Sequence, residues 1–314
     1  MHKDKLTVGY SEKYAENFNK IQEAGVMNIY ICAKYPTFIL PYANKWQKAG
    51  HSVVVSQRFD PFMAQKADLL FAEWMDENAV MIQNFKTSHI KHVRKILRLH
   101  RYEAYTEIYK YIKWDEWDEI VFVARHPAEY LKKITKIPFK YKVIRQGVEL
   151  NKYDFAPKEG NKIAYMGYLS RKKGLGELEM LANSFRDYEF HLAGGFLEGD
   201  LEEKLEKNRN LHFHGWIEQK DKNEFFKDMK YVISPAISES GHISLMEGML
   251  CGCKPLIRDW IGADEVYKQE WIWDGFQTFS QLLHSSYEPE KYREFIESNY
   301  DFERSYKEMT ELLC

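Results

Sequence analysis

Short runs of Val, Ile and Leu alternate with amphipathic segments along most of the chain. In the first half this pattern predicts strands at 27–33, 51–56, 67–74, 95–100 and 118–124, with helices at 40–50 and 78–87. Apolar strands separated by helices are typical of a largely parallel sheet. Residues 11–25 precede the first strand, and their pattern is typical of an amphipathic helical appendage.

The alternation restarts after residues 141–155, which we interpret as a strand, a tight turn at Gly147 and an interdomain linker. Further strands are predicted at 161–169, 188–195, 211–217, 231–236 and 254–259. Helices are predicted at 175–185, 200–208 and 222–229, from near residue 241, and over 290–314 with a break near Tyr300 and Asp301.

This pattern predicts an α/β protein with two Rossmann-like domains, residues 1–147 and 148–314, that face a central cleft. We expect the last helix to pack back on the first domain. Ligands of such sheets bind beyond the carboxyl ends of the strands, so candidate site residues are sought there.

The composition agrees with a well-packed, two-domain globular protein. The chain has 314 residues, of which 45% are hydrophobic and 15% aromatic. No apolar run approaches the roughly 18 residues of a membrane span, and no secretory leader opens the chain. The 4 cysteines follow no disulfide or zinc spacing, so we expect a cytoplasmic protein. Peripheral contact at the inner membrane face is an alternative.

Charge is distributed unevenly along the chain. Residues 1–150 carry 24 Lys and Arg against 17 Asp and Glu, whereas the remainder carries 21 against 30. The stretch 86–101 is especially rich in Lys and Arg. Such a surface can serve solubility alone, or it can recruit an anionic partner such as a membrane, a phosphorylated glycan or a nucleic acid.

The segment 238–252, SESGHISLMEGMLCG, places two carboxylates around the start of a predicted helix. The first amides of a helix have no intrahelical partners, and this arrangement suits a bound phosphate. Glu239 and Glu247 can accept hydrogen bonds from hydroxyl groups on either side of that phosphate. Glu247 lies among apolar residues, where a solvated carboxylate is unusual, so two plain surface charges are the weaker interpretation. The segment therefore predicts a sugar-nucleotide site.

Four segments in this order resemble the family-4 retaining glycosyltransferases of the GT-B fold. Glu239 and Glu247 have seven residues between them and stand before GMLCGCKPL, as in the family's Glu motif. The other three segments are VIRQGVELNKYDF at 143–155, MGYLSRKKG at 166–174 and LHFHGWI at 211–217. The similarity covers roughly residues 141–265 well and the N-terminal half only in outline.

The resemblance implies that the second domain binds a nucleoside diphosphate sugar. It implies that Glu247 holds the ribose hydroxyls and that Glu239 contacts the transferred sugar. Lys173 matches the family's diphosphate lysine, whereas the family's arginine is replaced by Tyr168, and Arg171 is the nearest substitute. The implied donor-binding residues are Gly167, Arg171, Lys173, Ser240, Gly241, His242, Ile243 and Glu247.

In the first domain the resemblance points to His100, at the carboxyl end of a predicted strand. The family often carries a histidine there, near the sugar and acceptor, although a purely structural histidine is the alternative. Arg101 and Glu103 follow and could orient acceptor hydroxyls. The implied catalytic residues are His100, Glu239, Arg171 and Lys173.

Neither a cofactor nor a metal is expected. A growing diphosphate charge can be stabilised by Arg and Lys without a metal ion. The acidic stretch 115–119 is more typical of a solvated loop than of a metal site, and no His or Cys ligand set is evident from spacing. Cys251 and Cys253 are expected to be core thiols.

The sequence thus predicts a metal-independent, retaining, hexosyltransferase-like enzyme. It would move a sugar from a nucleoside diphosphate to a hydroxyl of a glycan, lipid-linked or other anionic acceptor, with nucleic acid as a further possibility. The alternatives are a GT-B nucleotide-sugar epimerase and a non-enzymatic module that binds nucleotide sugars or nucleic acid.

Overall fold

The computed structural model describes residues 25–87, 92–199, 205 and 208–313. The chain forms two compact units. Among the described residues, one unit holds those up to Leu99, Glu107–Val121 and those from Met309, and the other holds His100–Thr106 and those within Phe122–Glu308. The helix predicted at 11–25 and most of the one at 200–208 lie outside the described residues.

The first sheet has six strands in the order β2-β1-β3-β4-β5-β6. Its strands are β1 (Asn28–Cys32), β2 (Ser52–Ser56), β3 (Leu69–Glu73), β4 (Arg94–Leu99), β5 (Glu119–Phe122) and β6 (Lys142–Val143). The pairs β1–β2, β1–β3 and β3–β4 are parallel, as the alternating pattern predicts. All five residues of β3 are buried, which is typical of a strand covered on both faces.

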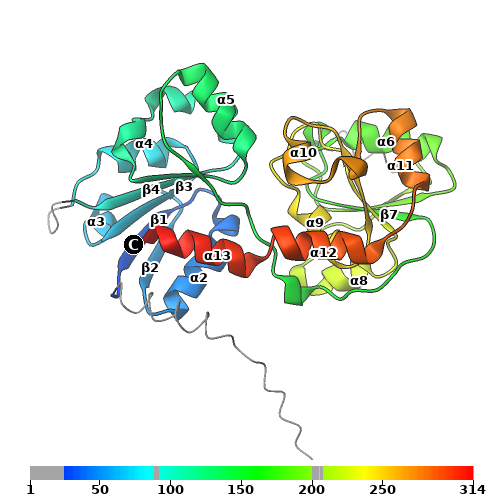
Figure 1. The fold of residues 1–314 in the computed structure, drawn as a ribbon, viewed down its shortest axis with the longest axis horizontal. Coiled ribbons are helices and arrows are strands. Elements are labelled where there is room, and N and C mark those ends of the chain that lie inside the picture. Colours follow the sequence, from blue (N-terminus) through cyan, green and yellow to red (C-terminus); the bar gives the residue numbers. More distant parts are fainter. Residues whose placement is uncertain (1–24, 88–91, 200–204, 206–207, 314) are drawn as a thin grey trace, which may run out of the picture. The chain divides into compact units, whose positions relative to one another are not determined.

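The helices that follow these strands are α2 (Leu40–Lys48), α3 (Pro61–Ala64), α4 (Glu77–Asn84) and α5 (Arg125–Thr135). In Figure 1, α2 and α4 lie on opposite faces of the sheet. The start of α4 is fixed by Asp76, whose carboxylate accepts hydrogen bonds from the amides of Asn78 and Ala79. The sequence pattern did not predict α5, because its apolar positions are few.

The second sheet also has six strands, in the order β12-β11-β10-β7-β8-β9, and all five of its strand pairs are parallel. The strands are β7 (Lys162–Met166), β8 (Glu189–Ala193), β9 (Leu211–Phe213), β10 (Tyr231–Ser234), β11 (Lys254–Arg258) and β12 (Ile272–Trp273). The described helices are α6 (Leu175–Ser184), α8 (Lys222–Phe226), α9 (Ile243–Leu250), α10 (Ala263–Val266), α11 (Phe276–His284), α12 (Pro289–Asn299) and α13 (Phe302–Thr310).

Two apolar cores cover the two faces of this second sheet. On β7, Ile163 and Tyr165 pack in the core beneath α6 and α11, whereas Ala164 and Met166 pack beneath α9 and α12. This division follows from the alternation of side chains along a strand, and Figure 1 shows the helices on both sides. Cys251 and Cys253 are buried, as predicted.

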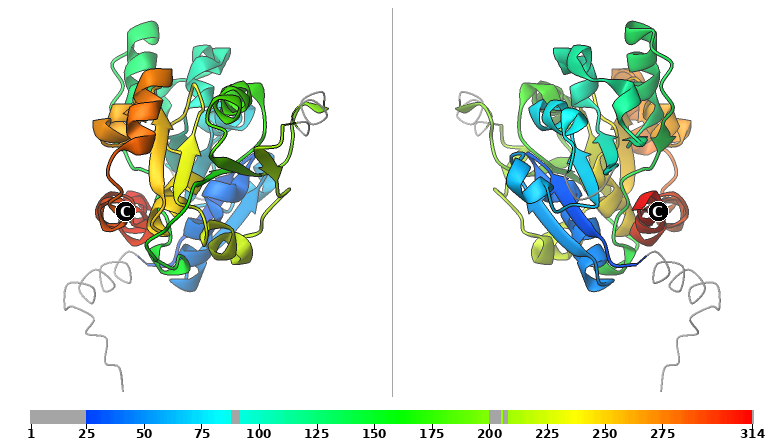
Figure 2. Two further views of the ribbon diagram at one scale, coloured as in Figure 1. Left: turned by 90° about the vertical axis from the view of Figure 1, so that its right-hand side faces the viewer. Right: turned by 90° about the vertical axis from the view of Figure 1, so that its left-hand side faces the viewer.

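The last two helices, α12 and α13, run nearly in line and are separated by a break at Tyr300 and Asp301, as the sequence predicts (Figures 1 and 2). The chain end then packs within the first compact unit. There Trp46 Nε1 donates to Thr310 Oγ1 at 2.9 Å, and Arg94 Nε donates to the Leu312 carbonyl at 3.0 Å.

Two of the basic residues in the stretch 86–101 are buried and therefore do not belong to a charged surface. Lys95 is 5% exposed, and its ammonium donates to the Gln83 carbonyl at 2.7 Å. Arg98 is fully buried and pairs with the equally buried Glu73 at 2.8 Å. The expectation of surface charge was wrong for Lys95 and Arg98, because β4 is an inner strand of its sheet.

None of the helices in the described part of the chain has the length and apolar character needed to cross a membrane.

Candidate donor-binding site

The candidate site is built where β7 and β8 end and α9 begins. The Gly167 amide donates to the Ala193 carbonyl at 2.9 Å, which holds the two strand ends together. Gly194 has φ +141°, and a Cβ there would lie 1.8 Å from the Gly167 carbonyl oxygen. Only glycine allows this close approach of the two chains. The glycines at these strand ends therefore keep side chains away from the carboxyl edge of the sheet.

The beginning of α9 is anchored to this edge by His242. Its Nε2 lies 2.9 Å from the Met166 carbonyl oxygen, so Nε2 carries the proton and donates it. Its backbone amide donates to the Tyr267 hydroxyl at 3.1 Å. Burial lowers the pKa of His242, so the ring is neutral in the folded protein. These two hydrogen bonds fix the position of His242 at the start of α9.

The first hydrogen bonds within α9 are donated by the backbone amides of Leu245 and Met246, and both go to the His242 carbonyl oxygen. The amides of the two residues before them lie at the start of the helix. The amides of Ile243 and Ser244 therefore have the free orientation that a helix N-terminus offers to an anion. Ser240 and Gly241 form the turn before it, and Gly241 has φ +148°.

Lys173 and Glu239, predicted separately from two motifs, form an ion pair. The Lys173 ammonium donates to Glu239 Oε1. Lys173 closes a short turn, Arg171–Lys173, in which the Ser170 hydroxyl accepts from its amide at 3.3 Å. The next residue, Gly174, passes so close to Pro235 that a Cβ would lie 2.2 Å from the Pro235 carbonyl oxygen. This approach brings the RKKG turn against the segment that leads to Glu239.

Glu247 is buried on α9 and has two partners that the sequence analysis missed. The Lys222 ammonium lies 2.7 Å from each carboxylate oxygen, and the Tyr153 hydroxyl donates to Oε1 at 2.5 Å. Gln219 Nε2 in turn donates to the Tyr153 hydroxyl at 2.9 Å. Burial, followed by the charge of Glu247, raises the pKa of Tyr153, which therefore stays protonated and donates.

A buried carboxylate needs a cation or a hydrogen-bond donor as its partner. The apolar neighbours of Glu247 in the sequence were therefore the only sign that such a partner exists. Spacing could not identify the partner, because Lys222 lies 25 residues before Glu247 and Tyr153 lies 94 residues before it. Lys222 and Tyr153 hold the carboxylate of Glu247 in a fixed orientation.

Arg171 lies in the same turn as Lys173 but contacts a different carboxylate. Its amide donates to Glu198 Oε1 at 3.1 Å, and its guanidinium pairs with Glu198 Oε2. The side chain is 59% exposed. In this structure Arg171 thus binds the loop after β8 rather than Glu239.

The acceptor-side candidates follow β4 directly. The His100 amide donates to Glu103 Oε1 at 2.7 Å, and both residues are buried. The Arg101 guanidinium lies 4.6 Å from the centre of the Tyr105 ring. The carboxylate of Glu103 therefore fixes the backbone of His100 and contributes to the turn that ends the strand.

Two parallel six-stranded sheets, each with its own helices, define a GT-B fold. Residues 149–301 match the sequence model of the family described as glycosyl transferases group 1. This segment contains Lys173, Glu239 and Glu247. No curated protein sequence matches the chain.

Several solved structures share the fold at low sequence identity. Sucrose-phosphate synthase from Thermosynechococcus elongatus superposes with a TM-score of 0.70 at 12% identity, over 90% of this chain and 97% of that one. HepE from Anabaena in complex with UDP gives 0.69 at 13%, over 91% and 98%. A mutant of S. aureus TarM in complex with Fondaparinux, alpha-GlcNAc-glycerol and UDP gives 0.63 at 15%, over 78% of this chain. The matched part spans about half, 55%, of that TarM chain.

Proposed function

We propose that the protein is a glycosyltransferase that moves a sugar from a nucleoside diphosphate to an acceptor hydroxyl. The observation that carries this proposal is the Lys173–Glu239 ion pair beside the open amides of α9, within the segment that matches the family. The glycosyltransferase family and the GT-B neighbours support the activity. The complexes of HepE with UDP and with UDP-glucose support a UDP-sugar donor.

In this proposal Lys173 stabilises the negative charge that grows on the departing diphosphate. The amides of Ile243 and Ser244 bind its oxygens from the helix N-terminus. Positive charge that is already in place costs no reorganisation during the reaction, so no metal ion is required for this step. Glu239 holds Lys173 before the donor arrives and contacts the transferred sugar afterwards.

Glu247 binds the ribose of the donor. Each of its carboxylate oxygens has two lone pairs, so it can accept from a ribose hydroxyl while it keeps its bonds to Lys222 and Tyr153. A hydrogen bond from a ribose hydroxyl to a carboxylate is charge-assisted and therefore stronger than one to a neutral acceptor.

Transfer proceeds with retention at the anomeric carbon, as the resemblance implies. The bond from that carbon to the diphosphate oxygen breaks, and the acceptor oxygen bonds on the same face. The departing phosphate takes the acceptor proton, so no separate protein base is needed. His100 orients the sugar, Arg101 and Glu103 orient the acceptor, and Arg171 joins Lys173 on the diphosphate after leaving Glu198.

The acceptor in this proposal is a glycan, which the complex of TarM with alpha-GlcNAc-glycerol and Fondaparinux supports. A basic surface is a weaker reason to expect an anionic acceptor, since two of its predicted cations are buried.

The test is a donor screen with the purified protein. UDP-, GDP- and ADP-sugars are supplied with and without a mixture of glycan acceptors, and release of the nucleoside diphosphate is measured. We expect turnover of one nucleotide class, faster with acceptor, with or without EDTA. Conversion of the donor to its epimer without nucleotide release, or no turnover of any donor, would overturn the proposal.

A further inference from the structure

A cluster of three histidines and one glutamate lies on β8 and along β9 of the second sheet, and none of the four is a proposed donor-binding residue. Glu189 and His191 are two residues apart on β8, and His191 pairs in register with His212 on the edge strand β9. His214 follows two residues later. Because side chains alternate along a strand, all four project from the same face of the sheet.

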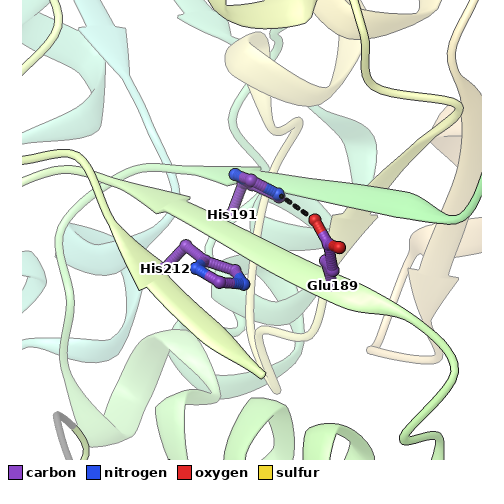
Figure 3. Close-up of side chains that lie close together, drawn as sticks. All are labelled: Glu189, His191 and His212. Carbon is purple, nitrogen blue, oxygen red and sulfur yellow. Dashed lines mark hydrogen bonds and ion pairs between the residues drawn. The ribbon is translucent and has the colours of Figure 1, made fainter. Parts of the chain in front are cut away.

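The side chains of Glu189, His191 and His212 converge (Figure 3). One potential ligand atom from each of the three lies within 4.8 Å of the others. His191 Nε2 is 3.3 Å from Glu189 Oε2, and the rings of His191 and His212 stack with centroids 4.8 Å apart. Two imidazoles and one carboxylate are a common ligand set for zinc and for similar divalent ions.

His214 is the fourth member of the cluster and contacts His191. Its Nε2 lies 2.9 Å from His191 Nδ1, and its ring packs on Phe225 with centroids 5.3 Å apart. A histidine that binds a metal through one nitrogen usually donates the hydrogen on its other nitrogen to a nearby acceptor. His214 Nε2 is placed to accept that hydrogen from His191 Nδ1.

We propose that Glu189, His191 and His212 bind a divalent transition-metal ion of the zinc type, with His214 as the residue that positions His191. The metal takes the place of the proton that joins His191 Nε2 to Glu189. His191 then carries its hydrogen on Nδ1 and donates it to His214. A solvent water fills the remaining position, because His212 is exposed.

The environment of the cluster favours metal ligation on one count and opposes it on another. His191 is only 9% exposed, and its contacts with Glu189 and His214 fix the direction of its ring. Lys162, the register partner of Glu189 on β7, places a positive charge nearby and works against a cation. The effect of this positive charge on metal binding can be tested directly, because replacing Lys162 with a neutral residue changes none of the proposed ligands.

This inference is independent of the proposed function. None of the four residues is among the proposed donor-binding residues, and metal binding is measured without a sugar donor. A metal held here serves the stability of the β8–β9 edge rather than the transfer step.

The experiment uses the tag-free, full-length chain after removal of metals with EDTA. Zn²⁺ is titrated in competition with a chromophoric chelator, and Co²⁺ is added separately for visible spectroscopy. We expect one Zn²⁺ per chain with a Kd of about 1 µM or tighter. We expect the intense visible bands of four-coordinate Co²⁺.

Three variants and one control separate the cluster from the rest of the chain. His214→Ala should weaken Zn²⁺ binding roughly 10–100-fold, and His212→Ala at least as much, since it removes a ligand. Lys162→Gln should tighten binding. His284→Ala is the control, because His284 is an exposed histidine on α11 whose Nδ1 bonds to the Ser280 carbonyl at 2.7 Å.

Glu189→Gln, at a partly exposed position, provides a second ligand variant in case His212→Ala disturbs the edge strand. Wild-type binding no tighter than that of both ligand variants would overturn the proposal. So would an equal loss in His284→Ala, or the weak Co²⁺ bands of an aqueous, six-coordinate ion.

Discussion

At the scale of single residues, the proposed donor site is built on two carboxylates that are each paired with a lysine. Glu239 pairs with Lys173, and Glu247 pairs with Lys222. Glu247 is 4% exposed, and an ionised carboxylate at such a position is costly unless it is paired and hydrogen-bonded. A site of this kind holds its charges in position before the ligand arrives.

Glu247→Gln tests this arrangement. The amide retains the shape of the side chain but replaces a charge-assisted bond to the ribose with a neutral one. We expect donor affinity to fall by about 1.5–3 kcal/mol, measured by calorimetry with the nucleoside diphosphate that the donor screen selects.

The control for this variant is Glu224→Gln on α8, where the side chain is 79% exposed and pairs with Lys227. Chemical denaturation should also show a loss of stability for Glu247→Gln alone, because Lys222 keeps its charge and loses its partner. Unchanged affinity in a folded Glu247→Gln protein would remove Glu247 from the donor site.

At the scale of elements, the site depends on how closely β7 and β8 approach at their carboxyl ends. The Gly194 amide also donates to the Gly215 carbonyl at 2.7 Å, so the chain after β9 joins the same edge. Three strand ends are therefore held together by glycine backbones, and the surface that the donor would meet is main chain.

Gly194→Ala should disrupt this edge. The added Cβ would lie 1.8 Å from the Gly167 carbonyl oxygen, in a backbone conformation that residues other than glycine rarely adopt. We expect the free energy of unfolding to fall by at least about 2 kcal/mol, measured with denaturant.

Gly195→Ala is the matched control, since a Cβ at Gly195 meets no atom within 4 Å. Its free energy of unfolding should stay within about 1 kcal/mol of the wild-type value. Equal stability of the two variants would show that the strand ends do not approach as described.

The strands and most helices of both sheets were predictable, because buried parallel strands have continuous apolar runs that end at polar or glycine residues. The β8–β9 cluster was not predictable, because strand register brings His191 and His212 together across 21 residues of chain. The prediction of surface charge at 86–101 was wrong at two positions for a related reason. Lys95 contacts Gln83, and Arg98 pairs with Glu73, only in the folded sheet. Pairing between distant segments is the information that a single sequence lacks.

At the scale of the whole molecule, the GT-B fold supplies two α/β sheets, and the second one carries every residue of the proposed donor site. The structural neighbours share this fold at 11–15% identity, so their substrates do not transfer to this chain on the fold alone. The central claim is therefore chemical: a lysine fixed by Glu239 stabilises a departing diphosphate.

The most direct measurement of this claim is the kcat of Lys173→Ala beside that of Lys172→Ala, with the donor that the screen selects. Lys172 is the adjacent, exposed lysine of the same turn, so the two variants differ only in which ammonium is lost. We predict that Lys173→Ala lowers kcat by roughly 100-fold or more, while Lys172→Ala stays within about threefold of the wild type. Equal rates for the two variants, with both proteins folded, would contradict the account.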